Sequence, residues 1–167
     1  AGGLAFGADI TATTSNSGGF DFIPATPDRS TFASPYIAYD TSGGAFNDRL
    51  YLVYANETPD ESDDFDIFLR TSLNDGASWS APVQVNLDPG SRSQFFNTIS
   101  VDPDTGAVWI SWYDARNDRA DGSVGDIDTD GAANSEVEYF ATASLDGGAI
   151  FLPEVVVSDG ASDEDNA

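Results

Sequence analysis

Hydrophobic residues recur along this chain in short runs in which apolar and more polar positions alternate. Residues 64–71 show the pattern clearly, because Phe65, Ile67 and Leu69 alternate with Asp66, Phe68 and Arg70. A period of two places alternate side chains on opposite faces of a strand. Eight such runs, separated by Gly, Pro, Asn and Asp, predict an all-β fold. The predicted strands cover residues 34–40, 49–55, 64–71, 82–86, 97–102, 107–114, 136–143 and 153–158.

The eight predicted strands fall into two units of four, which indicates an internal repeat. Each unit is expected to form a four-stranded antiparallel sheet, a blade that needs sister sheets to cover its faces. Four-stranded repeats of this kind predict a β-propeller, of which this chain supplies two blades within a larger propeller or assembly. The predicted divisions are an irregular N-terminal segment at 1–33, a first blade at 34–93, a second blade at 94–158 and an acidic connector at 159–167. Within the first segment, a strand is expected at 8–13 and a loop at 18–28.

The same turn motif follows the third strand of both units. Its Asx side chain can accept backbone N–H groups and its glycine can take a positive φ. Its serine hydroxyl can tie adjacent strands, and its aromatic ring is expected to be buried under the sheet. The motif is therefore interpreted as a folding device rather than a catalytic one. The first copy comprises Ser72, Asn74, Gly76 and Trp79, and the second comprises Ser144, Asp146, Gly148 and Phe151.

This motif resembles the Asp box, or bacterial neuraminidase repeat, of sialidase-type propellers, whose pattern is Ser-x-Asp-x-Gly-x-Thr-Trp. Asn74 replaces the Asp in the first copy, and Phe151 replaces the Trp in the second. The resemblance covers residues 34–158 and implies a sialidase-like propeller of bacterial type. Sialidases carry three arginines, an Asp acid and a Tyr–Glu nucleophile pair, and the first arginine precedes an Ile-Pro dipeptide. Here Phe22 precedes Ile23 and Pro24, so the resemblance assigns no catalytic residue.

Composition narrows the range of functions. The chain of 167 residues carries 29 acidic residues, 23 of them Asp, against 6 Arg, and its formal net charge is −23. Nucleic acid and anionic membrane surfaces would be repelled by this charge. The absence of Cys and His excludes disulfides, zinc–thiolate sites and imidazole catalysis. An Asp-rich surface is typical of a protein that functions in the presence of calcium or high salt. It is also typical of a solvated surface that keeps a protein soluble through charge repulsion.

One acidic stretch has the spacing of a calcium loop. Asp126, Asp128 and Asp130 alternate and are followed by Gly131, as in the first half of an EF-hand loop. The twelfth position is Val137 instead of Glu, with Glu136 beside it, and no helices are predicted around the loop. Two interpretations stay open. One is a calcium site between strands, with Asp126, Asp128, Asp130 and Glu136 as ligands. The other is a disordered acidic insertion. Asp121 is a further candidate ligand.

These observations favour a non-catalytic extracellular or cell-surface module with a structural, adhesive or glycan-binding role, stabilised by calcium. A second hypothesis is an enzyme, namely part of an exo-sialidase-like glycoside hydrolase whose catalytic residues lie in other blades. A self-assembling subunit that associates through unpaired sheet edges is the third hypothesis. Exposed strand aromatics among Tyr51, Tyr54, Trp109 and Trp112 are able to stack on sugar rings, although packing between blades is the commoner role of such residues.

Overall fold

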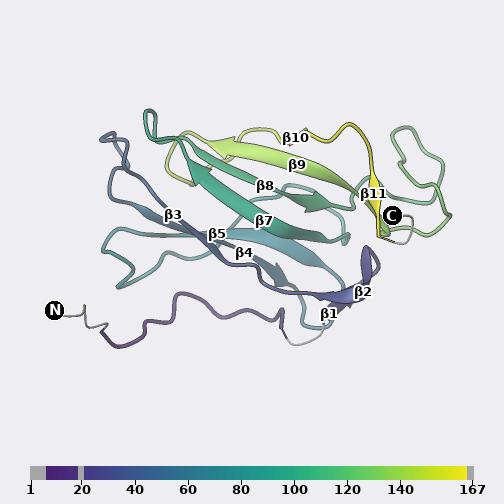
Figure 1. Ribbon diagram of the computed structural model, residues 1–167, viewed down its shortest axis with the longest axis horizontal. Helices are drawn as coiled ribbons and strands as arrows, with labels where there is room; N and C mark the ends of the chain where they lie inside the picture. Colours follow the sequence, from purple (N-terminus) through teal and green to yellow (C-terminus); the bar gives the residue numbers. More distant parts are fainter. Residues whose placement is uncertain (1–6, 19–20, 165–167) are drawn as a thin grey trace, which may run out of the picture.

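The computed structural model describes residues 7–18 and 21–164, and within these ranges the chain is built of strands and irregular segments with no helix (Figure 1). A short hairpin precedes two larger antiparallel sheets, so the predicted all-β class is confirmed. No described segment forms a helix long and apolar enough to cross a membrane. The strands are β1 (Asp21–Ile23), β2 (Thr26–Thr31), β3 (Tyr36–Tyr39), β4 (Leu50–Glu57), β5 (Phe65–Ser72), β6 (Val83–Gln84), β7 (Gln94–Val101), β8 (Val108–Asp114), β9 (Glu136–Ser144), β10 (Val155–Val156) and β11 (Ser162–Asp163).

The two large sheets repeat one topology. The first has the order β3-β4-β5-β6, and the second has the order β7-β8-β9-β10, with β11 also paired to β9. Their central pairs share a register, because Leu50 lies opposite Ser72 in the first sheet and Val108 lies opposite Ser144 in the second. The two turn serines therefore occupy equivalent positions, as the internal repeat predicts.

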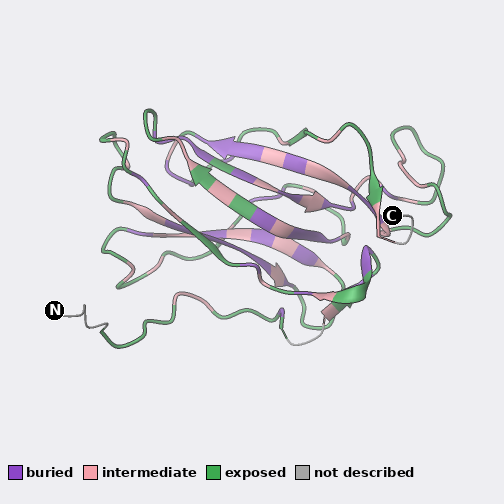
Figure 2. Cartoon of the chain, viewed as in Figure 1, coloured by how far each residue is buried: buried purple, intermediate pink, exposed green. Residues whose placement is uncertain are grey.

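The core lies between the two sheets, which stack as layers (Figure 1). Side chains from β4 and β5, including Tyr51 and Leu69, form one buried cluster with Ile110, Trp112 and Phe140 of the second sheet. In Figure 2 the buried positions form bands along these strands. Burial of such large apolar side chains supplies most of the favourable free energy of folding.

Equivalent faces of the two sheets differ in how far they are buried. Tyr51 in the first sheet is fully buried, whereas its equivalent in the second sheet, Trp109, is 52% exposed. Of the four strand aromatics considered for sugar stacking, Tyr51, Tyr54 and Trp112 are buried and only Trp109 faces solvent. Packing therefore explains three of these four rings.

The N-terminal segment differs from the prediction in two places. Residues 8–13 form no strand, and the predicted loop at 18–28 contains most of the β1–β2 hairpin. The backbone of β4 already pairs with β3 and β5, so the segment attaches to β4 through side chains instead. Ser17 Oγ donates to the Ala55 carbonyl at 3.1 Å, and the Asn16 N–H donates to Asn56 Oδ1 at 2.8 Å. At the other end, β11 lies inside the stretch predicted as a connector.

Candidate functional site

The long acidic insertion between β8 and β9 is organised around one buried carboxylate. Asp118 has no exposed surface. Its Oδ2 accepts the backbone N–H groups of Ser135 at 2.6 Å and Glu136 at 2.8 Å, together with the Ser135 hydroxyl at 3.2 Å. The Asp118 carbonyl also accepts the Arg92 Nε–H at 2.7 Å. Asp118 therefore ties the start of the insertion to the beginning of β9 and to the segment that leads into β7.

Two further carboxylates join Asp118 to form a cluster. Asp118, Asp128 and Glu136 each offer one oxygen, and these oxygens lie within 4.8 Å of one another. Glu136 is buried, and it accepts the Thr129 N–H at 2.7 Å and the Thr129 hydroxyl. Asp128 Oδ1 accepts the Gly131 N–H at 2.8 Å. We refer to Asp118, Asp128 and Glu136 as the carboxylate cluster.

The cluster has the chemistry of a divalent cation site. Asp118 Oδ1 is buried and has no hydrogen-bond partner. Among the described residues, no ion pair reaches any of the three carboxylates. Three carboxylates at this separation repel one another, and burial removes the water that would screen them. Ca²⁺ binds carboxylate and carbonyl oxygens in flexible loops and would supply the missing positive charge.

The sequence prediction and the cluster share two residues. Asp128 and Glu136 belong to the cluster, whereas Asp126 and Asp130 lie outside it. Asp126 instead caps the loop, since the backbone N–H groups of Arg119, Asp121, Gly122 and Asp128 donate to its carboxylate. These bonds, that of Arg119 first, hold the pKa of Asp126 below its ordinary value. Asp130 is exposed and accepts the Ala132 N–H at 2.7 Å.

Sequence reasoning missed Asp118, the residue that anchors the cluster. It lies ten positions before Asp128 and belongs to no alternating acidic pattern. The loop brings it close by a backbone bond from the Ile127 N–H to the Asn117 carbonyl at 3.1 Å. The one weak signal was its position in a loop rich in Asp, Asn and Gly, where Asp side chains commonly accept backbone N–H groups.

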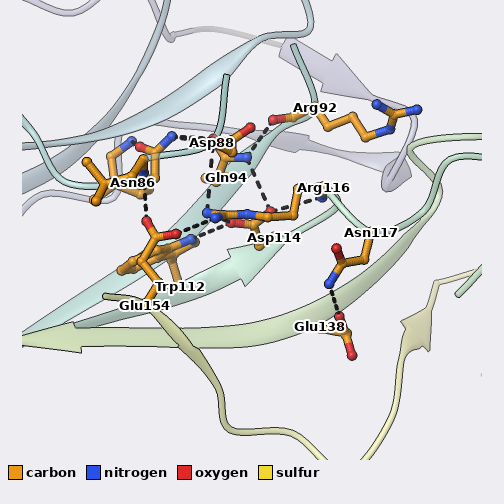
Figure 3. A network of polar contacts seen from close by, with 12 residues as sticks. Asn86, Asp88, Arg92, Gln94, Trp112, Asp114, Arg116, Asn117, Glu138 and Glu154 are labelled. Atoms are coloured by element: carbon orange, nitrogen blue, oxygen red, sulfur yellow. Dashed lines mark hydrogen bonds and ion pairs between the residues drawn. The ribbon is translucent and has the colours of Figure 1, made fainter. Parts of the chain in front are cut away.

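A second polar network joins the two sheets around Arg116 (Figure 3). Its guanidinium contacts Asp114 at 2.6 Å, Asp88 at 3.7 Å and Glu154, and it lies over the Phe140 ring at 4.5 Å. Asp114 also accepts the Trp112 Nε1–H at 2.8 Å. Three carboxylates therefore surround one cation, which leaves Arg116 little capacity to bind a substrate carboxylate.

Arg116 belongs to a group of arginines gathered at one place. Arg92, Arg116 and Arg119 line a pocket of about 280 Å³. Arg119 donates to the Asn117 side chain at 3.1 Å and to Ser123 Oγ at 2.9 Å, and Arg92 is bonded to the Asp118 carbonyl. Arg92 thus holds the acidic loop against the segment that leads into β7, and Arg119 stabilises the loop from within.

The two predicted turn motifs have the same hydrogen bonds. Ser72 Oγ accepts the N–H groups of Asn74 at 3.4 Å and Gly76 at 2.9 Å, and it donates to Asn74 Oδ1 at 3.0 Å. Asn74 Oδ1 in turn accepts the Ser78 N–H at 2.9 Å. Both glycines have positive φ, +83° at Gly76 and +86° at Gly148.

The second turn repeats these bonds residue for residue. Ser144 Oγ accepts the N–H groups of Asp146 and Gly148 at 3.4 and 2.9 Å, and it donates to Asp146 Oδ1 at 2.8 Å. Asp146 Oδ1 accepts the Ile150 N–H at 2.9 Å. The aromatic positions differ, since Phe151 is buried and Trp79 is only half-buried.

Comparison with known proteins shows which solved structures this fold resembles. No protein-family model and no curated protein sequence matches the chain. Among solved structures, a Hadza microbial sialidase, Hz136, superimposes with a TM-score of 0.51 and 17% identity over 77% of this chain and 29% of that one. An N-acetylgalactosamine deacetylase from F. plautii, in complex with blood group B trisaccharide, matches with a TM-score of 0.43 and 26% identity over 77% of this chain and 31% of its own. The chain has a sialidase-like all-β fold and spans less than a third of the length of either structure.

Proposed function

We propose that this chain is a calcium-stabilised, non-catalytic part of an extracellular sialidase-type β-propeller with a structural or glycan-binding role. The carboxylate cluster carries the proposal, because Asp118 Oδ1 is buried without a partner beside two other carboxylates. A buried charge of this kind is costly unless a cation or hydrogen bonds compensate it. A bound Ca²⁺ would fix both ends of the insertion at the start of β9.

The two turns support the assignment to Asp-box propellers. Their serines hold equivalent registers in the two sheets and make the same hydrogen bonds. A motif that repeats in sequence, register and bonding is typical of a blade repeat. We therefore interpret Ser72 to Trp79 and Ser144 to Phe151 as two Asp boxes, the first with Asn in place of Asp.

The environment of Arg116 supports a non-catalytic role for this part of the protein. A substrate carboxylate that approached Arg116 would meet Asp88, Asp114 and Glu154, which already neutralise it. Like charges at such a site oppose anion binding. The neighbouring sialidase structure is similar in fold, and fold alone does not confer its activity on this chain.

Calcium binding can be tested with two aspartates of the same acidic stretch. Asp128 belongs to the cluster and Asp130 lies outside it. We expect the melting temperature of the wild type to be higher in CaCl₂ than in EGTA. A ligand that binds only the native state, present at a concentration of 100 times its Kd, adds about 2.7 kcal/mol to the free energy of unfolding. Asp128→Asn should remove most of this rise, and Asp130→Asn should keep it.

Isothermal titration calorimetry of the three proteins with CaCl₂ provides the direct measurement. One site per chain in the wild type and in Asp130→Asn, with affinity lost in Asp128→Asn, is the expected result. The proposal is wrong if the wild type releases no binding heat and melts at the same temperature in CaCl₂ and EGTA. An equal loss of calcium affinity in both variants would instead support the ligands predicted from the alternating spacing of residues 126–130.

A further inference from the structure

Five aromatic rings form a continuous strip near the β1–β2 hairpin. We call Phe32, Phe96, Phe95, Tyr113 and Tyr139 the aromatic strip. Successive ring centroids are 6.0, 5.1, 6.0 and 4.9 Å apart, in that order. Phe32 at one end is 53% exposed, and Phe96 and Tyr113 are partly exposed, whereas Phe95 is buried beneath them.

Two hollows flank Phe96 and make this strip accessible. One, of about 340 Å³, is lined by Phe95, Phe96 and Tyr113 together with polar residues from β2 and the end of the chain. The other, of about 310 Å³, is lined by Phe32, Tyr36, Phe96 and Asn97. Because Phe96 lines both, they are adjacent parts of one aromatic surface.

The backbone at Phe96 is strained in a way that places its ring between the two hollows. Phe96 has φ of +49°, which is a rare value for a bulky residue. The register of the β7–β8 pair shifts between Phe95 and Thr98 at the same place. Irregularities of this type re-aim side chains and occur often next to binding sites, where strain is retained for function.

Each hollow is also lined by a residue that has a buried oxygen without a hydrogen-bond partner. Asn97 is 1% exposed, and its Oδ1 has no partner, while its amide donates to the Ser34 carbonyl at 3.0 Å. Glu164 Oε2 likewise has no partner, although Oε1 pairs with Arg29 across the rim. Buried acceptors without partners are few in native proteins, and they favour a ligand that brings hydroxyl donors.

We propose that the aromatic strip binds a neutral oligosaccharide. The apolar C–H faces of successive sugar rings would stack on Phe32, Phe96 and Tyr113, and hydroxyl groups would donate to Asn97 Oδ1 and Glu164 Oε2. The net charge of −23 disfavours anionic sugars, and Arg29 on the rim is already neutralised by Glu164, so it offers no free cation for an anionic ligand. This inference rests on the glycan-binding role proposed above, and it uses no residue of the carboxylate cluster.

Two rings of equal exposure provide a matched test. Phe32 is 53% exposed on the strip, and Trp109 is 52% exposed on the second sheet outside it. Binding is measured by calorimetry against neutral hexasaccharides of glucose, mannose and N-acetylglucosamine, with a galacturonate hexamer as the anionic probe. We expect one neutral probe to bind, Phe32→Ala to weaken it about fivefold to tenfold, and Trp109→Ala to leave it unchanged.

A second variant separates binding from folding. Phe96→Gly removes the ring and at the same time relieves the positive φ, so the protein should stay folded by circular dichroism while it loses affinity by a similar factor. Binding that is unaffected by Phe32→Ala and Phe96→Gly would overturn the strip as the site but leave a glycan-binding role standing. If none of the probes binds, both the strip and the glycan-binding role fail. The same titrations in EGTA should give the same affinity, so the calcium proposal is judged separately.

Discussion

Individual carboxylates in this chain differ mainly in their hydrogen-bond partners, their burial and the charges around them. Asp126 accepts four backbone N–H groups, which lower its pKa. Asp64 is the opposite case, because its Oδ1 is buried with no partner. Burial first, and then the charges of Asp66 and Asp88, raises the pKa of Asp64 to about 6. An acidic protein thus contains single carboxylates whose ionisation opposes folding.

Asp64→Asn should stabilise the protein at neutral pH and not at pH 4. The pKa of Asp64 is raised in the folded state, so the native protein binds the proton more tightly than the unfolded chain does. Stability is therefore lost as pH rises from about 4 to about 6, and Asn removes that loss. We expect a gain of about 1 kcal/mol at pH 7.5, reduced for solvent screening.

Urea denaturation at pH 4, 5, 6 and 7.5 measures the difference between the variant and the wild type. Asp60→Asn, at an exposed position of the same loop, removes the same charge and is the control. A gain at pH 7.5 that is no larger than that of Asp60→Asn would show that Asp64 acts only through the net charge.

At the scale of elements, the turn after β9 also forms part of the contact between the sheets. A Cβ on Gly148 would lie 2.5 Å from Leu69 Cδ2 and 3.5 Å from Tyr51 Cε1, both in the first sheet. Gly43 provides the comparison, because its φ of +71° is also positive but a Cβ there would meet nothing within 4 Å. Conformational strain is thus common to both glycines, and steric exclusion is confined to Gly148.

Gly148→Ala should therefore destabilise the protein far more than Gly43→Ala. We expect about 1 kcal/mol for Gly43→Ala from the positive φ alone, and about 3 kcal/mol or more for Gly148→Ala, since the added methyl group must displace the buried Leu69. Urea denaturation of both variants gives the two values. Equal losses would mean that the turn and the first sheet are not packed together.

The elements that sequence could predict are those whose residues alternate strongly. Eight of the nine strands from residue 34 onward follow from this pattern, β11 being the exception, and both turns follow from Ser-x-Asx-x-Gly. The β1–β2 hairpin was not predictable in this way, because Pro24 and Pro27 are typical of a loop and hide the pairing. Asp118 was missed for a related reason, since its partners come from distant loop residues rather than from a local spacing.

The whole molecule combines a well-packed interior with a strongly charged exterior. The sheets share one apolar cluster, whereas the net charge of −23 is spread over a chain with six arginines. At least four of these arginines, Arg49, Arg92, Arg116 and Arg119, are engaged by carbonyls or carboxylates in the structure. Self-repulsion among the remaining carboxylates lowers the stability of a compact state.

Stability should consequently rise with ionic strength even when no calcium is present. The Debye length falls from about 30 Å at 0.01 M to about 3 Å at 1 M, so added salt screens repulsion across the surface. We expect the melting temperature in EGTA to rise by about 5 °C between 20 mM and 500 mM NaCl, and KCl to act in the same way. In calorimetric scans the melting temperature should rise gradually with NaCl, because NaCl acts by screening. The rise with CaCl₂ should saturate at low concentration, because Ca²⁺ acts by occupying the carboxylate cluster. A melting temperature that stays constant or falls with NaCl would mean that the charges are already compensated within the fold, and the need for a cation at Asp118 would weaken with it.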